Sequence, residues 1–493
     1  MTAAGRITYI DRIPFASGSI ITEKPDFVGR NQTVIECPVD RRESYYIHSE
    51  SKRPKVTRFD DTVYNFPVLW EDDGITPWHD GNQFLWSLLF NKTDATFKQL
   101  NHKAKQLMEY KLFTEANYGY DLLDFKSLRP AHRVSYAYFY HLLKRGISAG
   151  NLNQHTATVY QFYEWLNEQP HIELDLTRVD KTHRAFIKFE TNWGKVMSKE
   201  VKVRSQMVVT PQASSVRQGF VRDEGEDLRP LYDDEFDLLC AILGTTQFTA
   251  TERMIYQVAL DTGARKQTVL TLRKKHVDKL MQGKPDEYGT VRLNCSSAIG
   301  IDTKGGRVLA IHFPRELIER LHIYVNSADY IKKVAKFKAA RKPRPEDLQE
   351  ENNEMPDDDI YVFLSNQGNP LYMAKDDPLY RKLKTPPEGN YLQTVTRKIK
   401  AAEPKHFPSD YTFHWTRATY AYRFYKFLTP LVDSGQLGVS DAIVLIQRRL
   451  GHKLRETTEH YLQLFKMTNL RLEAQERYEE RLFNSVHINE EVA

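Results

Sequence analysis

The sequence predicts a mainly α-helical protein with a small β-sheet, divided into more than one domain. The chain has 493 residues, and 41% of them are hydrophobic, which is enough for two or three separate cores. Long stretches place apolar residues three and four positions apart, as in a helix with one buried face. Short runs of β-branched and aromatic residues between Gly, Pro and charged residues indicate the few strands.

The composition narrows the class of protein. A formal net charge of +5 is compatible with nucleic-acid binding without requiring it. The three cysteines, Cys37, Cys240 and Cys295, have neither the spacing of a zinc site nor that of a disulfide framework, which indicates a reducing compartment. Because neither a signal peptide nor an apolar run of about 20 residues is present, we expect a cytoplasmic protein that does not enter a membrane.

The first domain is predicted to be helical and to span residues 81–205, after an N-terminal extension of unknown role at 1–80. In the extension, TVIECPV and SYYIHS are typical of short strands. In the domain, Tyr136, Phe139, Tyr140 and Leu143 mark one buried helical face. The four predicted helices include FLWSLLF, TFKQLNHKAKQLMEYKLF, SYAYFYHLLKRG and HTATVYQFYEWLNEQ.

A linker is predicted at 206–227, since that stretch has no helical period. Residues 228–475 are expected to form a second domain, followed by a tail at 476–493. The first helix of this domain lies in LYDDEFDLLCAIL, where Asp233 or Asp234 is a suitable N-cap.

The second domain is predicted to mix helices with one pair of strands. TERMIYQVALDTGARKQTVLTL indicates two helices around a turn at Gly263, and VRLNC and RVLAIHFP indicate paired strands. Residues 329–359 are basic and then acidic, with three prolines, so a mobile insertion is expected there. Helices return in FHWTRATYAYRFYKFL and SDAIVLIQRRLG, and a last amphipathic helix is expected at 466–484.

Four short stretches carry candidate functional residues. In the first, His414 and Arg417 lie three residues apart on a predicted helix and can share one face. In the second, Gly451 ends a helix, His452 follows at once, and Tyr461 lies nine residues later. A glycine there permits a left-handed cap. Taken singly, each of these residues is more commonly structural.

The other two stretches supply an arginine and a lysine. Arg265 follows Gly263 near a predicted helix start, where backbone N–H groups and a guanidinium both favour an anion. Lys304 precedes Gly305 and Gly306 in a turn between the predicted strands.

Taken in chain order, with the arginine first, then the lysine, the His–Arg pair and the LGH stretch with its tyrosine, the four stretches resemble the catalytic motifs of the tyrosine recombinase (phage integrase) family. The family carries TG-x-R, a lysine in a β-turn, H-x-x-R, and LGH followed nine residues later by a nucleophilic tyrosine. The likeness covers 228–475 by motif and implies a mixed α/β catalytic domain, with 81–205 as its helical core-binding domain. The implied catalytic residues are Arg265, Lys304, His414, Arg417, His452 and Tyr461.

The chain departs from the family pattern at three points. Thr268 stands where the family often has Glu, so support for Arg265 must come from elsewhere. Ala418 stands where many relatives have His. The segment between Arg265 and Lys304 is longer than usual, which leaves Lys274, Lys275 and Lys284 as alternatives to Lys304.

The resemblance implies a site-specific recombinase that cuts and rejoins double-stranded DNA attachment sites through a 3′-phosphotyrosyl intermediate, without ATP. The resemblance also implies that the chain assembles as a homotetramer on DNA. Accessory DNA-bending or directionality proteins are further candidate partners. The acidic run PDDD at 356–359 is interpreted as solvated surface, so neither a metal nor a cofactor is expected. The alternatives are a type IB topoisomerase, a telomere resolvase and a non-catalytic DNA-binding protein.

Overall fold

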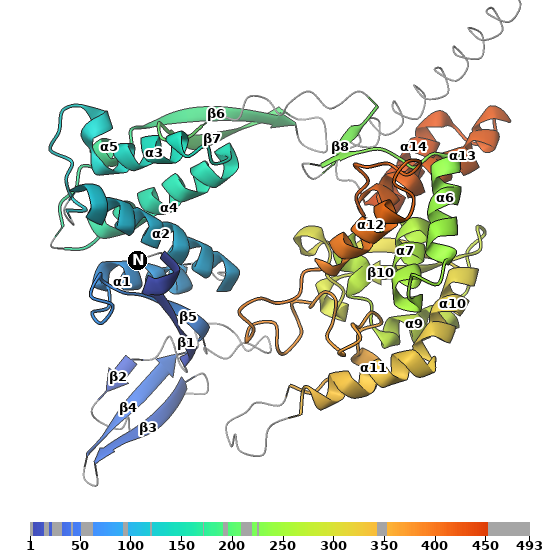
Figure 1. The fold of residues 1–493 in the computed structure, drawn as a ribbon, viewed down its shortest axis with the longest axis horizontal. Helices are drawn as coiled ribbons and strands as arrows, with labels where there is room; N and C mark the ends of the chain where they lie inside the picture. The colour runs from blue at the N-terminus through green and yellow to red at the C-terminus, as the bar shows by residue number, and fades with distance from the viewer. Residues whose placement is uncertain are drawn as a thin grey trace, which may run out of the picture. The chain divides into compact units, whose positions relative to one another are not determined.

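The computed structural model divides into two compact units, residues 1–212 with 381–385, and 213–380 with 386–493 (Figure 1). Each unit has its own hydrophobic core. Helices predominate, and each sheet in the described part of the chain has two or three strands, which confirms the mainly α prediction. The structure describes residues 3–13, 19–21, 32–40, 43–50, 63–91, 97–118, 121–170, 172–190, 196–208, 219–223, 226–342 and 353–451.

The helices of the first unit pack around an aromatic core. The four helices predicted from periodicity are present, and a short fifth follows. Their bounds are α1 (His79–Asn91), α2 (Phe97–Tyr118), α3 (Val134–Lys144), α4 (Ala149–Asn167) and α5 (Leu176–Val179). In the core, the ring centroids of Tyr110 and Tyr138 lie 5.0 Å apart, and Tyr110 is hydrogen-bonded to Tyr163.

The buried face of α3 differs from the one predicted. Tyr136 and Phe139 are buried, but Tyr140 is 44% and Leu143 is 41% exposed. The core side is formed instead by residues including Val134, Tyr138 and Leu142. The predicted and the observed buried residues both have helical spacing, because α3 carries apolar residues on more than one side. Packing against α2 and α4 decides which side is buried.

Two sheets precede these helices in the chain. Strand β1 (Ile7–Ile13), which follows the 3₁₀ turn η1 (Ala3–Arg6), pairs antiparallel with β5 (Val63–Leu69), and residues of both strands enter the helical core. Strand β4 (Glu43–Glu50) lies between β2 (Ser19–Ile21) and β3 (Gln32–Asp40). The strands predicted in TVIECPV and SYYIHS are therefore confirmed.

Two further hairpins lie in segments where no strand was predicted. Strands β6 (Thr182–Glu190) and β7 (Val196–Arg204) form an antiparallel ribbon from the Lys- and Arg-rich segment. Strands β8 (Val221–Asp223) and β9 (Glu226–Leu228) form a small hairpin. Val221 and Leu228 are buried in the core of the second unit, so the chain is anchored there before its first helix.

The second unit packs helices against the antiparallel pair of β10 (Thr290–Cys295) and β11 (Leu309–Pro314). This confirms the predicted strand pair. The helices described in this unit are α6 (Asp233–Gly244), α7 (Ala250–Thr262), α8 (Lys266–Leu270), α9 (Lys274–Gln282), α10 (Arg315–Val325), α11 (Ala328–Ala339), α12 (Tyr391–Ala402), α13 (Trp415–Asp433) and α14 (Val439–Leu450). In the described ranges, no helix has both the length and the apolarity needed to span a membrane.

The N-cap prediction for α6, Asp233 or Asp234, is wrong. Tyr232 is the N-cap, and Asp233 and Asp234 already belong to the first turn. The Tyr232 backbone N–H donates to the Glu235 carboxylate at 3.1 Å, so a glutamate three residues into the helix performs the capping.

The prediction that residues 329–359 form a mobile insertion is also wrong for most of the segment. Residues 328–339 form α11, whose Tyr330, Lys333 and Phe337 are buried. At the other end, Asp359 in the turn η5 (Asp357–Asp359) forms an ion pair with the buried Arg273 at 2.8 Å. Asp359 is therefore not the solvated residue predicted for the PDDD run, because a charged partner far away in sequence fixes it. Residues 343–352 lie outside the described residues.

Candidate active site

Arg265 is positioned by a tight turn between α7 and α8. Gly263 caps α7 in the left-handed conformation, with φ of 65°, and a Cβ there would lie 2.4 Å from the ring of Tyr420. Both facts require glycine. The half-buried Arg265 follows as N-cap of α8. Because α8 has only five residues, few peptide dipoles align in it, and its N-terminus carries only a weak dipole.

Arg417 joins two segments that carry other candidate residues. Its side chain is 1% exposed on the first turn of α13. Nη1 donates to the carbonyl oxygen of Gly263 at 2.8 Å, and Nη2 donates to the carbonyl oxygen of Leu450. These carbonyls lie two residues before Arg265 and two before His452, so one guanidinium holds the ends of α7 and α14 together.

His414 lies at the N-cap of α13, and the backbone N–H of Arg417 donates to its carbonyl oxygen at 3.1 Å. Its Nδ1 is 3.7 Å from Oε2 of Glu226, and Thr412 Oγ1 donates to the same oxygen at 3.3 Å. The neighbouring His414 imidazole lowers the pKa of Glu226. Glu226, which the sequence interpretation missed, is thus an acidic neighbour of this histidine.

Gly451 ends α14 as the sequence predicts, in the left-handed conformation with φ of 62°. A Cβ at this position would lie 2.2 Å from Cδ1 of Leu309. The close approach sets the end of α14 against the start of β11. His452, Tyr461 and the last predicted helix at 466–484 lie outside the described residues.

Lys304 lies in the exposed turn η4 (Lys304–Gly306), between strands β10 and β11. The loop that carries it is hydrogen-bonded to α8. Thr268 Oγ1 donates to the carbonyl oxygen of Asp302 at 2.9 Å, and the Asp302 N–H donates to Thr271 Oγ1 at 3.0 Å. The helix that begins after Arg265 therefore contacts the loop of Lys304, a link that residue spacing could not show.

Two of the alternative lysines form ion pairs of their own. Lys274 lies 3.1 Å from Asp278, and Lys275 pairs with Asp359. Lys284 is exposed after the end of α9. Ala418, where many relatives have His, is fully buried. Lys304 remains our candidate, because its loop is bonded to the helix that follows Arg265.

No protein-family model matches the chain, and no characterised protein matches its sequence significantly. A structure of the Tn1549 transposon integrase in complex with transposon right end DNA is similar over 77% of this chain and 93% of that chain, with 16% identity and a TM-score of 0.38. A structure of the XerH site-specific recombinase bound to palindromic difH substrate is similar over 78% and 85%, with 13% identity and a TM-score of 0.35.

Proposed function

We propose that this chain is a tyrosine-type site-specific DNA recombinase. The observation that supports this best is the double hydrogen bond of the buried Arg417 to Gly263 and Leu450. It connects the segments leading to Arg265 and to His452, which is the association that the catalytic motifs require. A chain that only binds DNA has no need for this set of residues in this order.

The residues suit attack on a phosphodiester. The transition state concentrates negative charge on the non-bridging phosphate oxygens, and Arg265 and Arg417 supply planar, permanently charged donors for them. A guanidinium has five N–H donors, so Arg417 has the capacity to bond two carbonyls and an anion together. His414 and His452 add donors, and one of them assists removal of the tyrosine proton.

Tyr461 is the proposed nucleophile. A tyrosine hydroxyl ordinarily has a pKa near 10, so the positive charges of the site would favour the attacking phenolate. The Tyr461 oxygen bonds to phosphorus, the bond to the 5′ oxygen breaks, and Lys304 gives a proton to that oxygen. The 3′-phosphotyrosyl link conserves the bond energy, so a 5′ hydroxyl of another strand reverses the step without ATP.

Residues 81–205 are proposed to bind DNA mainly through phosphates, as the Lys- and Arg-rich segment at its end suggests. The physiological assembly would be a homotetramer on attachment sites in the cytoplasm, associated with the nucleoid. Accessory DNA-bending or directionality proteins are proposed as further partners of this assembly.

A covalent-trapping experiment tests the nucleophile. Nicked duplexes are selected from a randomised pool for SDS-resistant attachment to the native chain, and Tyr461→Phe is then compared on the selected DNA. We expect the adduct to vanish with Tyr461→Phe and to persist with Tyr288→Phe, a control at a tyrosine that is 46% exposed. Tight DNA binding without any adduct would instead support a non-catalytic DNA-binding protein.

A second measurement tests the need for a metal. Because arginines rather than a cation neutralise the phosphate in the proposed mechanism, adduct formation should persist in EDTA. Loss of the adduct on chelation, with recovery on addition of magnesium, would contradict that mechanism.

Relaxation of supercoiled DNA that lacks the selected site would favour the type IB topoisomerase alternative.

A further inference from the structure

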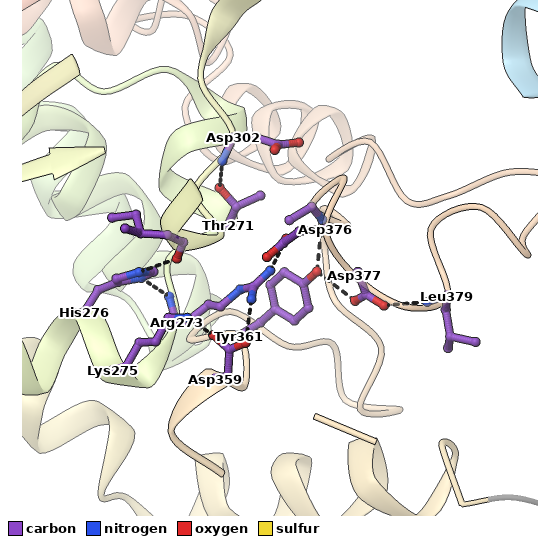
Figure 2. A network of polar contacts seen from close by, with 12 residues as sticks. Thr271, Arg273, Lys275, His276, Asp302, Asp359, Tyr361, Asp376, Asp377 and Leu379 are labelled. Atoms are coloured by element: carbon purple, nitrogen blue, oxygen red, sulfur yellow. Dashed lines mark hydrogen bonds and ion pairs between the residues drawn. The ribbon is translucent and has the colours of Figure 1, made fainter. Parts of the chain in front are cut away.

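The loop before Lys304 is fixed at Asp302 by two threonines, one on α8 and one at its C-cap. Thr268 lies on α8, Thr271 is the C-cap residue that follows the helix, and both are buried. One donates to the Asp302 carbonyl oxygen and the other accepts from the Asp302 N–H, at 2.9 and 3.0 Å. Figure 2 shows the second of these bonds. Both backbone groups of Asp302 are thus held by α8 and its C-cap.

The same loop is fixed further upstream by Arg273 and His276 (Figure 2). His276 Nδ1 accepts from the Arg273 N–H at 3.0 Å, and Nε2 lies 2.9 Å from the carbonyl oxygen of Ile299. Burial lowers the pKa of His276 to about 4, so the ring is neutral and carries its proton on Nε2. Gly300, with φ of 83°, packs so closely on the Arg273 guanidinium that a Cβ would lie 2.5 Å away.

The anchoring ends two residues before Lys304. Thr303 Oγ1 donates to the Arg307 carbonyl oxygen, and the Gly306 N–H donates to Thr303 at 3.1 Å, which closes the turn locally. Residues 304–308 themselves are exposed. Two extended residues span at most about 7 Å, so the position of Asp302 sets the range that the Lys304 backbone can reach.

We propose that Thr268 and Thr271 are positioning residues for Lys304, acting through the backbone of Asp302. The proposal rests on the proposed function, in which the Lys304 ammonium gives a proton to the leaving 5′ oxygen. A proton donor must lie within hydrogen-bond reach of its acceptor, and a shift of about 1 Å lowers a rate by as much as 100-fold. Arg265 and Lys304 would thereby be aligned by one short helix.

A substrate with sulfur in place of the bridging 5′ oxygen distinguishes a defect in the position of Lys304 from other causes of slower cleavage. With oxygen, the departing alkoxide needs the proton. With sulfur, the phosphorus–sulfur bond breaks and a thiolate leaves with the electron pair; because a thiol has a far lower pKa than an alcohol, it needs no acid. A defect confined to Lys304 or its position should therefore disappear on the sulfur substrate.

The experiment compares Thr268→Val, Thr268→Ser and Lys304→Ala in the full chain, on the selected duplex with either bridging atom. On oxygen, we expect Thr268→Val to lower the rate of adduct formation roughly 10- to 100-fold and Lys304→Ala to lower it by about 100-fold or more. Thr268→Ser, which keeps the hydroxyl, should restore most of the rate. On sulfur, all three variants should approach the native rate.

A matched control accounts for lost stability. Thr396, on α12, also has a buried hydroxyl, which is hydrogen-bonded to the hydroxyl of Tyr256 at 3.1 Å. The variant Thr396→Val removes this hydroxyl and should cleave both substrates like the native chain. Equal slowing of Thr268→Val on both substrates, or no slowing on oxygen, would overturn the positioning role. Failure of the native chain to form an adduct with either substrate would overturn the proposed function instead.

Discussion

Two buried arginines of the second unit, Arg273 and Arg417, differ in the hydrogen-bond acceptors that lie within the described residues. Each is 1% exposed. Arg273 is paired with the carboxylates of Asp359 and Asp376 and lies over the ring of Tyr361 at 5.3 Å. The bonds of Arg417 to Gly263 and Leu450 go to neutral carbonyl oxygens. Those bonds fix its orientation without cancelling its charge.

The difference separates a structural arginine from a candidate catalytic one. A guanidinium that two carboxylates neutralise contributes little to the binding of an anion, whereas one oriented by carbonyl groups keeps its positive field. Burial alone does not distinguish the two roles. The identity of the hydrogen-bond acceptors does, and these acceptors come from segments remote in the sequence.

The largest effect is expected when the neutralised arginine is removed. Arg273→Met removes the cation that Asp359 and Asp376 share, and of the two only Asp359 keeps another partner among the described residues, Lys275; breaking a buried pair costs about 3–5 kcal/mol, and we expect a loss toward the lower end of that range. Urea unfolding of the native and variant chains measures this loss. Adding Asp359→Asn and Asp376→Asn should recover part of it. A loss below about 1 kcal/mol, the size expected of an exposed pair, would contradict the structural role.

A smaller effect, on the reaction, is expected at the other arginine. Arg417→Lys replaces a planar fork with a point charge that cannot hold two carbonyls and a phosphate together. Adduct formation should fall about 100- to 1,000-fold, as when one transition-state donor is lost, while DNA affinity at fixed salt changes little. Arg423→Lys, at an exposed position of the same helix, is the control. Unchanged cleavage by Arg417→Lys would remove this residue from the mechanism.

The smallest effect concerns the ion pair of Glu226 with His414. The folded state lowers the pKa of Glu226 below its ordinary 4.5, so its contribution is present above pH 4.5 and is lost as pH falls through the lower, folded value. The side chain is half exposed, so we expect at most about 1 kcal/mol. Unfolding at pH 7 and at pH 3.5 should show that Glu226→Gln destabilises the chain less at the lower pH. Equal destabilisation at both would exclude a contribution from the charge.

Local sequence was sufficient for much of the fold. Helices α1 to α4, α6 to α8, α13 and α14, the β10–β11 pair and the glycine caps at Gly263 and Gly451 follow from patterns that extend over a few neighbouring residues. The interpretation of residues 329–359 was wrong, because composition cannot show that Asp359 has a buried partner 86 residues away. The buried face of α3 was misassigned because both of its faces carry apolar residues.

The sequence by itself determined the types, order and spacing of the candidate residues, and hence the chemistry we propose for Arg265, Lys304 and Tyr461. Only the tertiary structure decided that Arg417 binds the ends of α7 and α14, and that Thr268 holds the loop of Lys304. The physical reason is the distance along the sequence over which each property is determined. Backbone conformation responds to adjacent residues, whereas hydrogen-bond partners are set when chain segments tens of residues apart pack together.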